Sequence, residues 1–107
     1  MLLFEKSLDT DIAIVAEVGV NHEGSLEEAS SLLRLAYEAG ADAVKFQTYT
    51  PARFASTSDT SRFERVKKFS LSEAEHRQLS AEARDLGIAF FSTAVTEDVV
   101  PLIAELG

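Results

Sequence analysis

Three short apolar segments, each followed by a segment with helical periodicity, constrain this sequence more than any other feature. The apolar segments cover residues 12–18, 43–47 and 88–93. A nearly continuous apolar run of this length is typical of a strand that is covered on both faces, as strands are in parallel sheets. Strands that alternate with helices need crossover connections, so the sequence predicts an α/β fold with a parallel sheet.

The expected helices have recognisable end signals. Two Ser–Glu pairs have the spacing of a capping box, and each of the helices they begin should end at a glycine. These residues are Ser25 with Glu28 and then Gly40, and Ser72 with Glu75 and then Gly87. A last helix should begin near Asp98, because that start places Pro101 in the first turn, where its missing N–H costs little.

Three βα units in 107 residues correspond to the first three-eighths of a TIM (β/α)8 barrel, which takes about 250 residues. The sequence stops at Gly107, where a fourth strand is due. We therefore expect residues 1–107 to be the N-terminal portion of a truncated barrel domain. A flavodoxin-like or Rossmann sheet is the alternative, but residues 18–24 lack the G-x-G-x-x-G spacing of a dinucleotide-binding loop.

Composition restricts the partners. The chain carries 10 Lys+Arg against 18 Asp+Glu, a formal charge of -8, and no cysteine. An acidic surface repels phosphate backbones and anionic lipid, so we expect no nucleic acid and no membrane as partner. Without cysteine there is no disulfide framework, which fits a cytoplasmic protein. No segment approaches the roughly 20 apolar residues that cross a bilayer.

Charged groups interrupt two of the apolar strands near their C-terminal ends. Side chains alternate along a strand, so Glu17 and Lys45 share their faces with small or apolar neighbours, and Gln47 lies on the face of Lys45. In a barrel this face is the interior, and the carboxyl ends of the strands carry the chemistry. Two interpretations stay open: Glu17 and Lys45 form a structural ion pair, or they are catalytic residues.

Four further candidates lie at the same ends of the strands. Ser92 and Thr93 end the third strand with two hydroxyls, which either cap the next helix or bind an anion beside Lys45. Asn21 and His22 lie in the loop after the first strand. A single loop histidine is either structural or able to exchange a proton near neutral pH.

The second histidine and a long loop complete the candidates. His76 lies in the second helix among charged residues, and we expect it at the surface. Two histidines so far apart, with no third ligand in register, predict no metal site. Residues 49–69 form a connection much longer than the usual two to six residues. It carries five basic against two acidic residues, which either attract an anionic substrate or belong to a short helix near 61–68 with its charges in water.

Three ordered motifs resemble the N-terminal part of the sialic acid synthase (N-acetylneuraminate synthase) family. They are A-E-V-G-V-N-H-E-G at residues 16–24, G-A-D-A-V-K-F-Q-T at 40–48 and F-F-S-T at 90–93. The resemblance implies a (β/α)8 barrel that condenses phosphoenolpyruvate with N-acetylmannosamine or a related amino-sugar aldose. The products are phosphate and a nine-carbon 2-keto acid.

The same resemblance implies roles for the candidates. Lys45 would neutralise phosphoenolpyruvate, Ser92 and Thr93 would donate hydrogen bonds to it, and Gln47 would orient the sugar. Glu17 would position water or move a proton, while Asn21 and His22 belong to the motif without an assigned role. These seven candidates are catalytic Glu17 and Lys45 and substrate-binding Gln47, Ser92, Thr93, Asn21 and His22.

The resemblance also implies groups outside these residues. A divalent metal, Mn²⁺ or Mg²⁺, would polarise the sugar aldehyde, with its histidine ligands downstream of Gly107. A C-terminal antifreeze-like domain is likewise absent here, and the complete enzyme would be a homodimer. The chain departs from the family at Ala94-Val95, where Pro-Phe is usual. Two alternatives to the synthase stay open: a non-catalytic truncated barrel that acts only by association, and a diverged barrel aldolase or isomerase.

Overall fold

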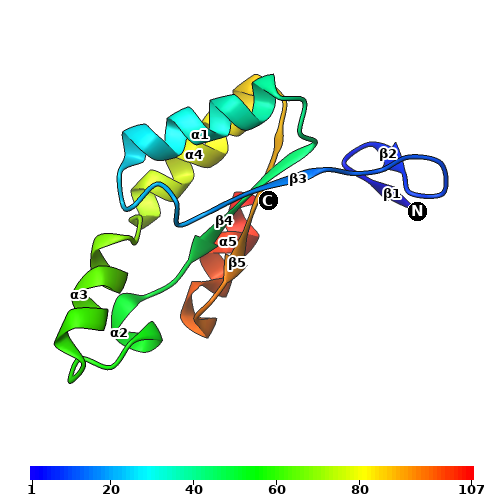
Figure 1. Cartoon of the computed structure of the whole chain (residues 1–107). Helices are drawn as coiled ribbons and strands as arrows, with labels where there is room; N and C mark the ends of the chain where they lie inside the picture. The colour runs from blue at the N-terminus through cyan, green and yellow to red at the C-terminus, as the bar shows by residue number, and fades with distance from the viewer.

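The computed structural model describes residues 1–107, and its centre is a three-stranded parallel sheet in the order β3-β4-β5. The strands are β3 (Val15–Gly19), β4 (Ala43–Thr48) and β5 (Ala89–Ala94). The helices that follow them in turn are α1 (Leu26–Glu38), α4 (Glu73–Leu86) and α5 (Val100–Leu106), the last after the 3₁₀ turn η1 (Glu97–Val99). The predicted repeat of strand and helix is thus observed three times (Figure 1).

The core lies between the sheet and the helices. Phe46 and Val44 of β4 are fully buried there against Leu33 of α1 and Leu79 of α4. Helices α1 and α4 pack side by side over this one face (Figure 1). α5 joins them through an ion pair of 2.6 Å between Arg77 and Glu105. The opposite face of the sheet carries no helix.

The predicted helix ends are confirmed. The Ser72 hydroxyl accepts from the Glu75 N–H at 3.1 Å and the Glu75 carboxylate accepts from the Ser72 N–H at 2.9 Å, which completes the capping box of α4. α4 ends at Gly87, whose φ of 88° is left-handed. At α1 only half of the predicted capping box forms, since the Ser25 hydroxyl accepts from the Glu28 N–H at 3.1 Å without the reciprocal bond. Because these signals are local, the sequence was sufficient to predict them.

The long connection after β4 folds into two helices, α2 (Pro51–Phe54) and α3 (Thr60–Lys68). The predicted short helix near 61–68 is therefore confirmed, with Phe63 and Val66 half-buried. The Tyr49 hydroxyl donates to the Val66 carbonyl at 2.8 Å, which fixes α3 to the end of β4. Both helices lie at the carboxyl ends of the strands (Figure 1).

The N-terminal residues form a hairpin that the sequence analysis did not predict. β1 (Leu2–Leu3) and β2 (Lys6–Ser7) are antiparallel, and the two residues between them, Phe4 and Glu5, have φ of 50° and 66°. Non-glycine residues seldom adopt such angles, and the turn contains no Asn-Gly pair. The sequence therefore carried no signal for this hairpin. The hairpin extends beyond the sheet (Figure 1), which raises the radius of gyration to 14.7 Å, against about 13 Å for a compact domain of this length.

The first strand begins later than predicted. Its first paired residue is Val15 rather than Ile12, because the backbone of Ile14 bonds to the turn before β4. The Ile14 N–H donates to the Asp42 carboxylate at 2.7 Å, and the Ile14 carbonyl accepts from the Asp42 N–H at 2.9 Å. The N–H of Ile14 is the main reason why the pKa of Asp42 lies below its usual value, and the Lys6 ammonium at 3.1 Å acts in the same direction.

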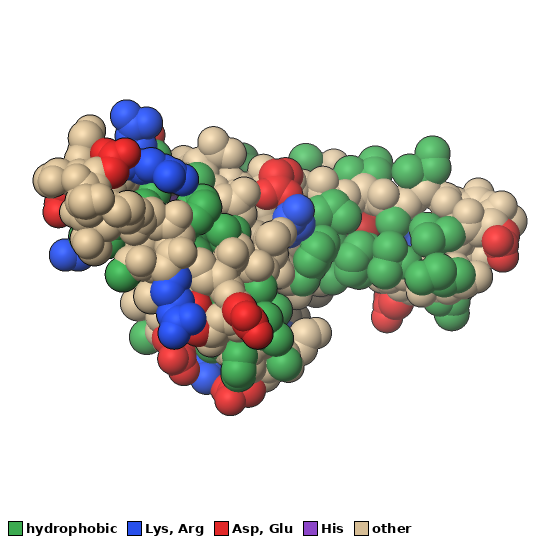
Figure 2. Space-filling view, turned by 90° about the horizontal axis from the view of Figure 1, so that it is seen from below, with side chains coloured by type: hydrophobic (Ala, Val, Ile, Leu, Met, Phe, Trp, Pro, Cys, Tyr) green, Lys and Arg blue, Asp and Glu red, His purple; other side chains and the backbone are tan.

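Part of the helix-free side of the molecule is apolar. Exposed hydrophobic side chains gather along the N-terminal segment and continue onto the sheet (Figure 2). They include Leu2, Ile12 and Ile14, with exposed fractions of 73%, 77% and 57%, and Phe91 of β5. Lys and Arg side chains gather instead over α2 and α3. None of the helices combines the length and the apolar character that crossing a bilayer would require.

Candidate functional site

The helix-free face of the sheet presents an ion pair at the carboxyl ends of its strands. Glu17 and Lys45 are direct partners in the register of β3 and β4, and Lys45 Nζ lies 3.1 Å from Glu17 Oε2. The two side chains are 48% and 31% exposed. An ion pair this exposed contributes little to stability. The pairing that the sequence left open therefore forms, and it leaves both groups accessible to a ligand.

A bulge in β3 places the Glu17 carboxylate. The register shifts between Glu17 and Gly19, and Gly19 adopts a φ of 58°. A Cβ at Gly19 would lie 3.2 Å from Glu17 Oε1 and 3.7 Å from Gln47 Nε2. A side chain there would therefore crowd both groups, so the glycine serves the local geometry as well as the bend.

Gln47 and Thr93 extend the same face. They are direct register partners on β4 and β5, two residues along these strands from Lys45 and Phe91. Gln47 is half-buried, and Thr93 is exposed. Four of the seven predicted site residues therefore share one surface, in the order expected from strand alternation. They are Glu17, Lys45, Gln47 and Thr93.

Ser92 points the other way. It is only 9% exposed, and its hydroxyl lies 2.6 Å from Thr48 Oγ1 on the helix-covered side. This position does not fit the predicted contact between Ser92 and phosphoenolpyruvate. The reason is the alternation of side chains along β5, which sends neighbours Ser92 and Thr93 to opposite faces.

Asn21 and His22 have different surroundings within one tight turn. Asn21 is exposed, and its side-chain amide donates to the Val18 carbonyl at 2.9 Å. His22 is 1% exposed and stacks on Phe46 with ring centroids 6.0 Å apart. Its Nδ1 accepts from the Gly24 N–H at 2.9 Å. The buried ring belongs to the core of the loop rather than to the open face, so direct substrate contact does not fit it.

Burial also affects the protonation of His22. Its pKa is lowered mainly because desolvation penalises the charged ring, and the nearby His76 acts in the same direction. The Gly19 backbone and the Glu75 carboxylate oppose this shift. His22 Nε2 is buried and makes no hydrogen bond. The ring is therefore held neutral near physiological pH.

The sequence predicted that His76 lies at the surface, and this prediction is wrong. The residue is only 1% exposed. Its Nε2 lies 2.8 Å from Thr48 Oγ1 and its Nδ1 lies 2.8 Å from the Ser72 carbonyl oxygen. The charged neighbours in sequence suggested an exposed position. The signal for burial was the helical spacing of His76 with Leu79 and Ala83, which face the core.

A second set of polar contacts joins the ends of β4 and β5. The Thr50 N–H donates to Thr96 Oγ1 at 3.0 Å, and the Thr50 hydroxyl donates to the Asp98 carboxylate. That hydroxyl is the main reason why the pKa of Asp98 lies below its usual value, with Thr96 adding to the effect. Arg53 Nε lies 3.9 Å from the same carboxylate. These contacts hold the loops that flank the site.

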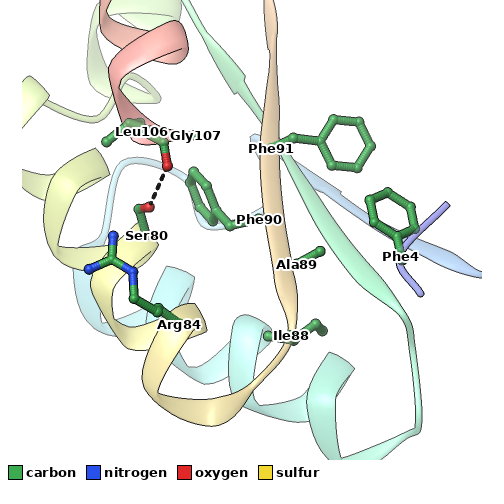
Figure 3. Close-up of a pocket in the computed structure, with 9 residues that line it drawn as sticks. All are labelled: Phe4, Ser80, Arg84, Ile88, Ala89, Phe90, Phe91, Leu106 and Gly107. Atoms are coloured by element: carbon green, nitrogen blue, oxygen red, sulfur yellow. Dashed lines mark hydrogen bonds between the residues drawn. The ribbon is translucent and has the colours of Figure 1, made fainter. Parts of the chain in front are cut away.

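The largest hollow of the molecule lies away from this site. It measures about 350 Å³ and lies beside the N-terminal half of β5 (Figure 3). Phe90 points toward α4 and α5, while Phe91 points to the helix-free side, where its ring stacks on Phe4 at 5.9 Å. Arg84 is the only ionisable side chain in its lining. The hollow offers no acid or base, so we place the chemistry at the carboxyl ends of the strands.

No three His, Asp or Glu side chains gather closely enough to hold a metal ion. Glu17 is paired with Lys45, and the two histidines are buried in the core. The residues of this chain therefore do not fit a divalent metal on their own.

Comparison with known proteins identifies the family. The NeuB family profile matches residues 32–107, which is most of the chain. The chain belongs to the NeuB family. The predicted resemblance is thereby confirmed.

Named relatives agree with this result. The chain is 37% identical over 107 residues to the N,N'-diacetyllegionaminic acid synthase of Legionella pneumophila, with 88% of this chain and 30% of the relative covered. It is 34% identical over 108 residues to the pseudaminic acid synthase of Campylobacter jejuni, with 89% and 32% covered. The chain thus spans about a third of the length of the curated relatives it matches.

A solved structure has the same arrangement. The N-acetylneuraminic acid (sialic acid) synthetase of Leptospira borgpetersenii, crystallised with citrate, superposes with a TM-score of 0.80 at 28% identity. The match covers 90% of this chain and 34% of that chain. The predicted fold class, α/β with the first three βα units of a barrel, is confirmed.

Proposed function

We propose that the complete protein condenses phosphoenolpyruvate with N-acetylmannosamine or a related amino-sugar aldose, forming a sialic-acid-type nonulosonic acid and phosphate. The observation that supports this most is the accessible Glu17–Lys45 pair beside Gln47 and Thr93 on one face of the sheet. A cation, a carboxylate and two neutral polar groups on adjacent strands match the needs of an anionic enol phosphate and a polyhydroxylated partner.

In this proposal Lys45 binds the carboxylate or phosphate of phosphoenolpyruvate, and Thr93 donates a hydrogen bond to it. Gln47 orients the sugar through its amide. The ammonium of Lys45 is now paired with Glu17 at 3.1 Å. An incoming anion competes for that ammonium and leaves the Glu17 carboxylate next to the reacting carbons.

The overall chemistry balances with one water. C3 of phosphoenolpyruvate forms a bond to the aldehyde carbon of the sugar, and water adds to C2. Loss of phosphate by cleavage of the C2–O bond then gives the 2-keto acid. Glu17 is placed to orient that water or to accept its proton. We further propose Mn²⁺ or Mg²⁺ as cofactor, held by residues outside this segment, and a homodimeric, cytoplasmic enzyme.

The sugar substrate differs among the named relatives. The named relatives make legionaminic and pseudaminic acids, so the family does not share one sugar substrate. In this chain Ala94-Val95 follows Thr93, and the Val95 N–H is bonded to the Thr48 carbonyl at 2.9 Å. Small side chains at this point leave more room beside the site than the aromatic ring usual in the family.

The test is phosphate release from phosphoenolpyruvate by the complete gene product with Mn²⁺, with and without N-acetylmannosamine and related hexosamines. Release that depends on one sugar would support the synthase and identify its substrate. A folded protein that is silent with every sugar would favour the non-catalytic alternative. Schiff-base trapping by borohydride would favour an aldolase.

Lys45→Ala gives the sharper arm of the same test. Loss of a charge-assisted contact of about 2–3 kcal/mol should lower kcat/KM for phosphoenolpyruvate about 30- to 150-fold. Arg34→Ala is the matched control, because it removes one positive charge on α1, where Arg34 pairs with Glu82 instead. Equal kinetics of the Lys45→Ala and Arg34→Ala variants would remove Lys45 from the site.

A further inference from the structure

A chain of hydrogen bonds lies directly behind the candidate site, on the helix-covered side of the sheet. The Ser92 hydroxyl is 2.6 Å from Thr48 Oγ1, which is 2.8 Å from His76 Nε2. His76 Nδ1 lies 2.8 Å from the Ser72 carbonyl oxygen at the start of α4. Ser92, Thr48 and His76 are 9%, 3% and 1% exposed. This series of hydrogen bonds therefore joins β5, β4 and α4 in the interior.

With a neutral His76, only one assignment of donors and acceptors satisfies this series of hydrogen bonds. A carbonyl oxygen accepts only, so the contact with Ser72 requires the proton on His76 Nδ1. His76 Nε2 is then an acceptor and receives the Thr48 hydroxyl proton. Thr48 Oγ1 is left to accept from the Ser92 hydroxyl. Each buried polar group is thereby satisfied in a single arrangement.

These hydrogen bonds lie at the carboxyl ends of β4 and β5. Thr48 and Ala94 are the last paired residues of β4 and β5. Thr48 follows Gln47, and Ser92 precedes Thr93. Gln47 and Thr93 are register partners that face the open side. Because neighbouring side chains point to opposite faces, a hydrogen bond that fixes Thr48 and Ser92 also fixes the direction of Gln47 and Thr93.

We propose that His76 is a positioning residue for the synthase reaction. Through Thr48 and Ser92 it holds the carboxyl ends of β4 and β5 in the geometry that Gln47 and Thr93 need. His76 itself touches no substrate, since it lies on the other side of the sheet. The inference rests on the proposed function for its kinetic part and on the hydrogen bonds alone for its structural part.

The experiment compares matched variants of the complete gene product. His76→Gln places a side-chain amide near the Nε2 position and keeps an acceptor for Thr48, whereas His76→Asn reaches only the Nδ1 position and leaves Thr48 unpaired. Thr48→Ser keeps the hydroxyl, and Thr48→Val removes it with little change of shape. Rates are measured well below each melting temperature and normalised to folded protein, with kcat and KM determined separately.

We expect His76→Asn and Thr48→Val to lower kcat about 10- to 100-fold, the scale of a small misplacement at a site, with KM for phosphoenolpyruvate within about threefold. His76→Gln and Thr48→Ser should keep kcat within about threefold of the unmodified enzyme. The double variant His76→Asn/Thr48→Val should be no worse than either single variant, because both break one chain.

Equal loss in the Gln and Asn variants at His76, or in the Ser and Val variants at Thr48, would overturn the proposal. So would a loss that normalisation to folded protein removes, since that is the behaviour of a purely structural contact. Each pair of variants tests the inference by itself, so failure of one variant to fold leaves the other pair decisive.

A spectroscopic arm separates this inference from the proposed function. ¹⁵N NMR of the imidazole should show His76 with the proton on Nδ1 and a bare Nε2, and the Nε2 signal should move in Thr48→Val but not in Thr48→Ser. A proton on Nε2 of neutral His76 would overturn the hydrogen-bond order whatever the activity. If no sugar supports phosphate release while the NMR result holds, the proposed function fails and the structural assignment stands.

Discussion

Gly24 lies where the turn after β3 touches the end of α3, and the contact leaves no room for a side chain. Its φ is 83°, and an added Cβ would lie 1.8 Å from the Lys68 carbonyl oxygen and 3.0 Å from its carbon. The obstacle is backbone, so it cannot rotate away. We expect Gly24→Ala to force α3 away from the turn that carries Asn21 and His22.

The expected loss in the free energy of unfolding of Gly24→Ala has two parts. A left-handed conformation costs a non-glycine residue about 1–2 kcal/mol. An overlap that backbone must relieve adds about 1–3 kcal/mol. Gly40 separates the two parts, because its φ is 87° but nothing lies within 4 Å of its Cβ position. Gly24→Ala should therefore lower the free energy of unfolding by about 1–3 kcal/mol more than Gly40→Ala.

Urea unfolding of the complete gene product, followed by circular dichroism, measures both losses under one set of conditions. Limited proteolysis provides a local readout, since α2 and α3 should be cut faster in Gly24→Ala than in Gly40→Ala. Losses that agree within about 0.5 kcal/mol would refute the reasoning, because the close approach to Lys68 would then carry no energy.

Two further predictions concern protonation and association. Because burial lowers the pKa of His22, the unfolded chain binds a proton that the folded chain does not, so the free energy of unfolding should decrease as pH falls below about 6.5. His22→Asn, which can still accept from the Gly24 N–H, should flatten that pH dependence in urea titrations at pH 5.5 to 7.5, and an unchanged slope would assign it to other groups. A polypeptide limited to residues 1–107 should be inactive and should self-associate through its exposed apolar face. Sedimentation that shows a monomer, together with a sharp thermal transition, would contradict this.

Local signals explain why much of the fold could be predicted. The strands contain apolar runs, and the helices have capping residues and terminal glycines, all of which act within a few residues of themselves. The faces of Glu17, Lys45, Gln47 and Thr93 followed from alternation alone. The same rule assigns Ser92 to the opposite face, although its position next to Thr93 had suggested that both hydroxyls bind one anion.

His76 and the N-terminal hairpin show where local reasoning fails. His76 stands among charged residues in sequence, yet its ring is buried against the hydroxyl of Thr48 in β4, which lies 28 residues away and is itself bonded to Ser92 of β5. The hairpin turn at Phe4 and Glu5 has positive φ without glycine. Its turn is stabilised by Phe4 stacking on Phe91 and by Lys6 pairing with Asp42, which are contacts between distant segments.

The sequence by itself determined the α/β class, the helix ends, the family and the strand face that carries the charged groups. The tertiary structure alone decided that Glu17 and Lys45 pair, that His22 and His76 lie in the core, and that Gly24 meets the backbone of Lys68. The difference has a physical reason. Capping, alternation and turn preferences are interactions within a few residues, whereas ion pairs, burial and close approach depend on which segments the sheet brings together.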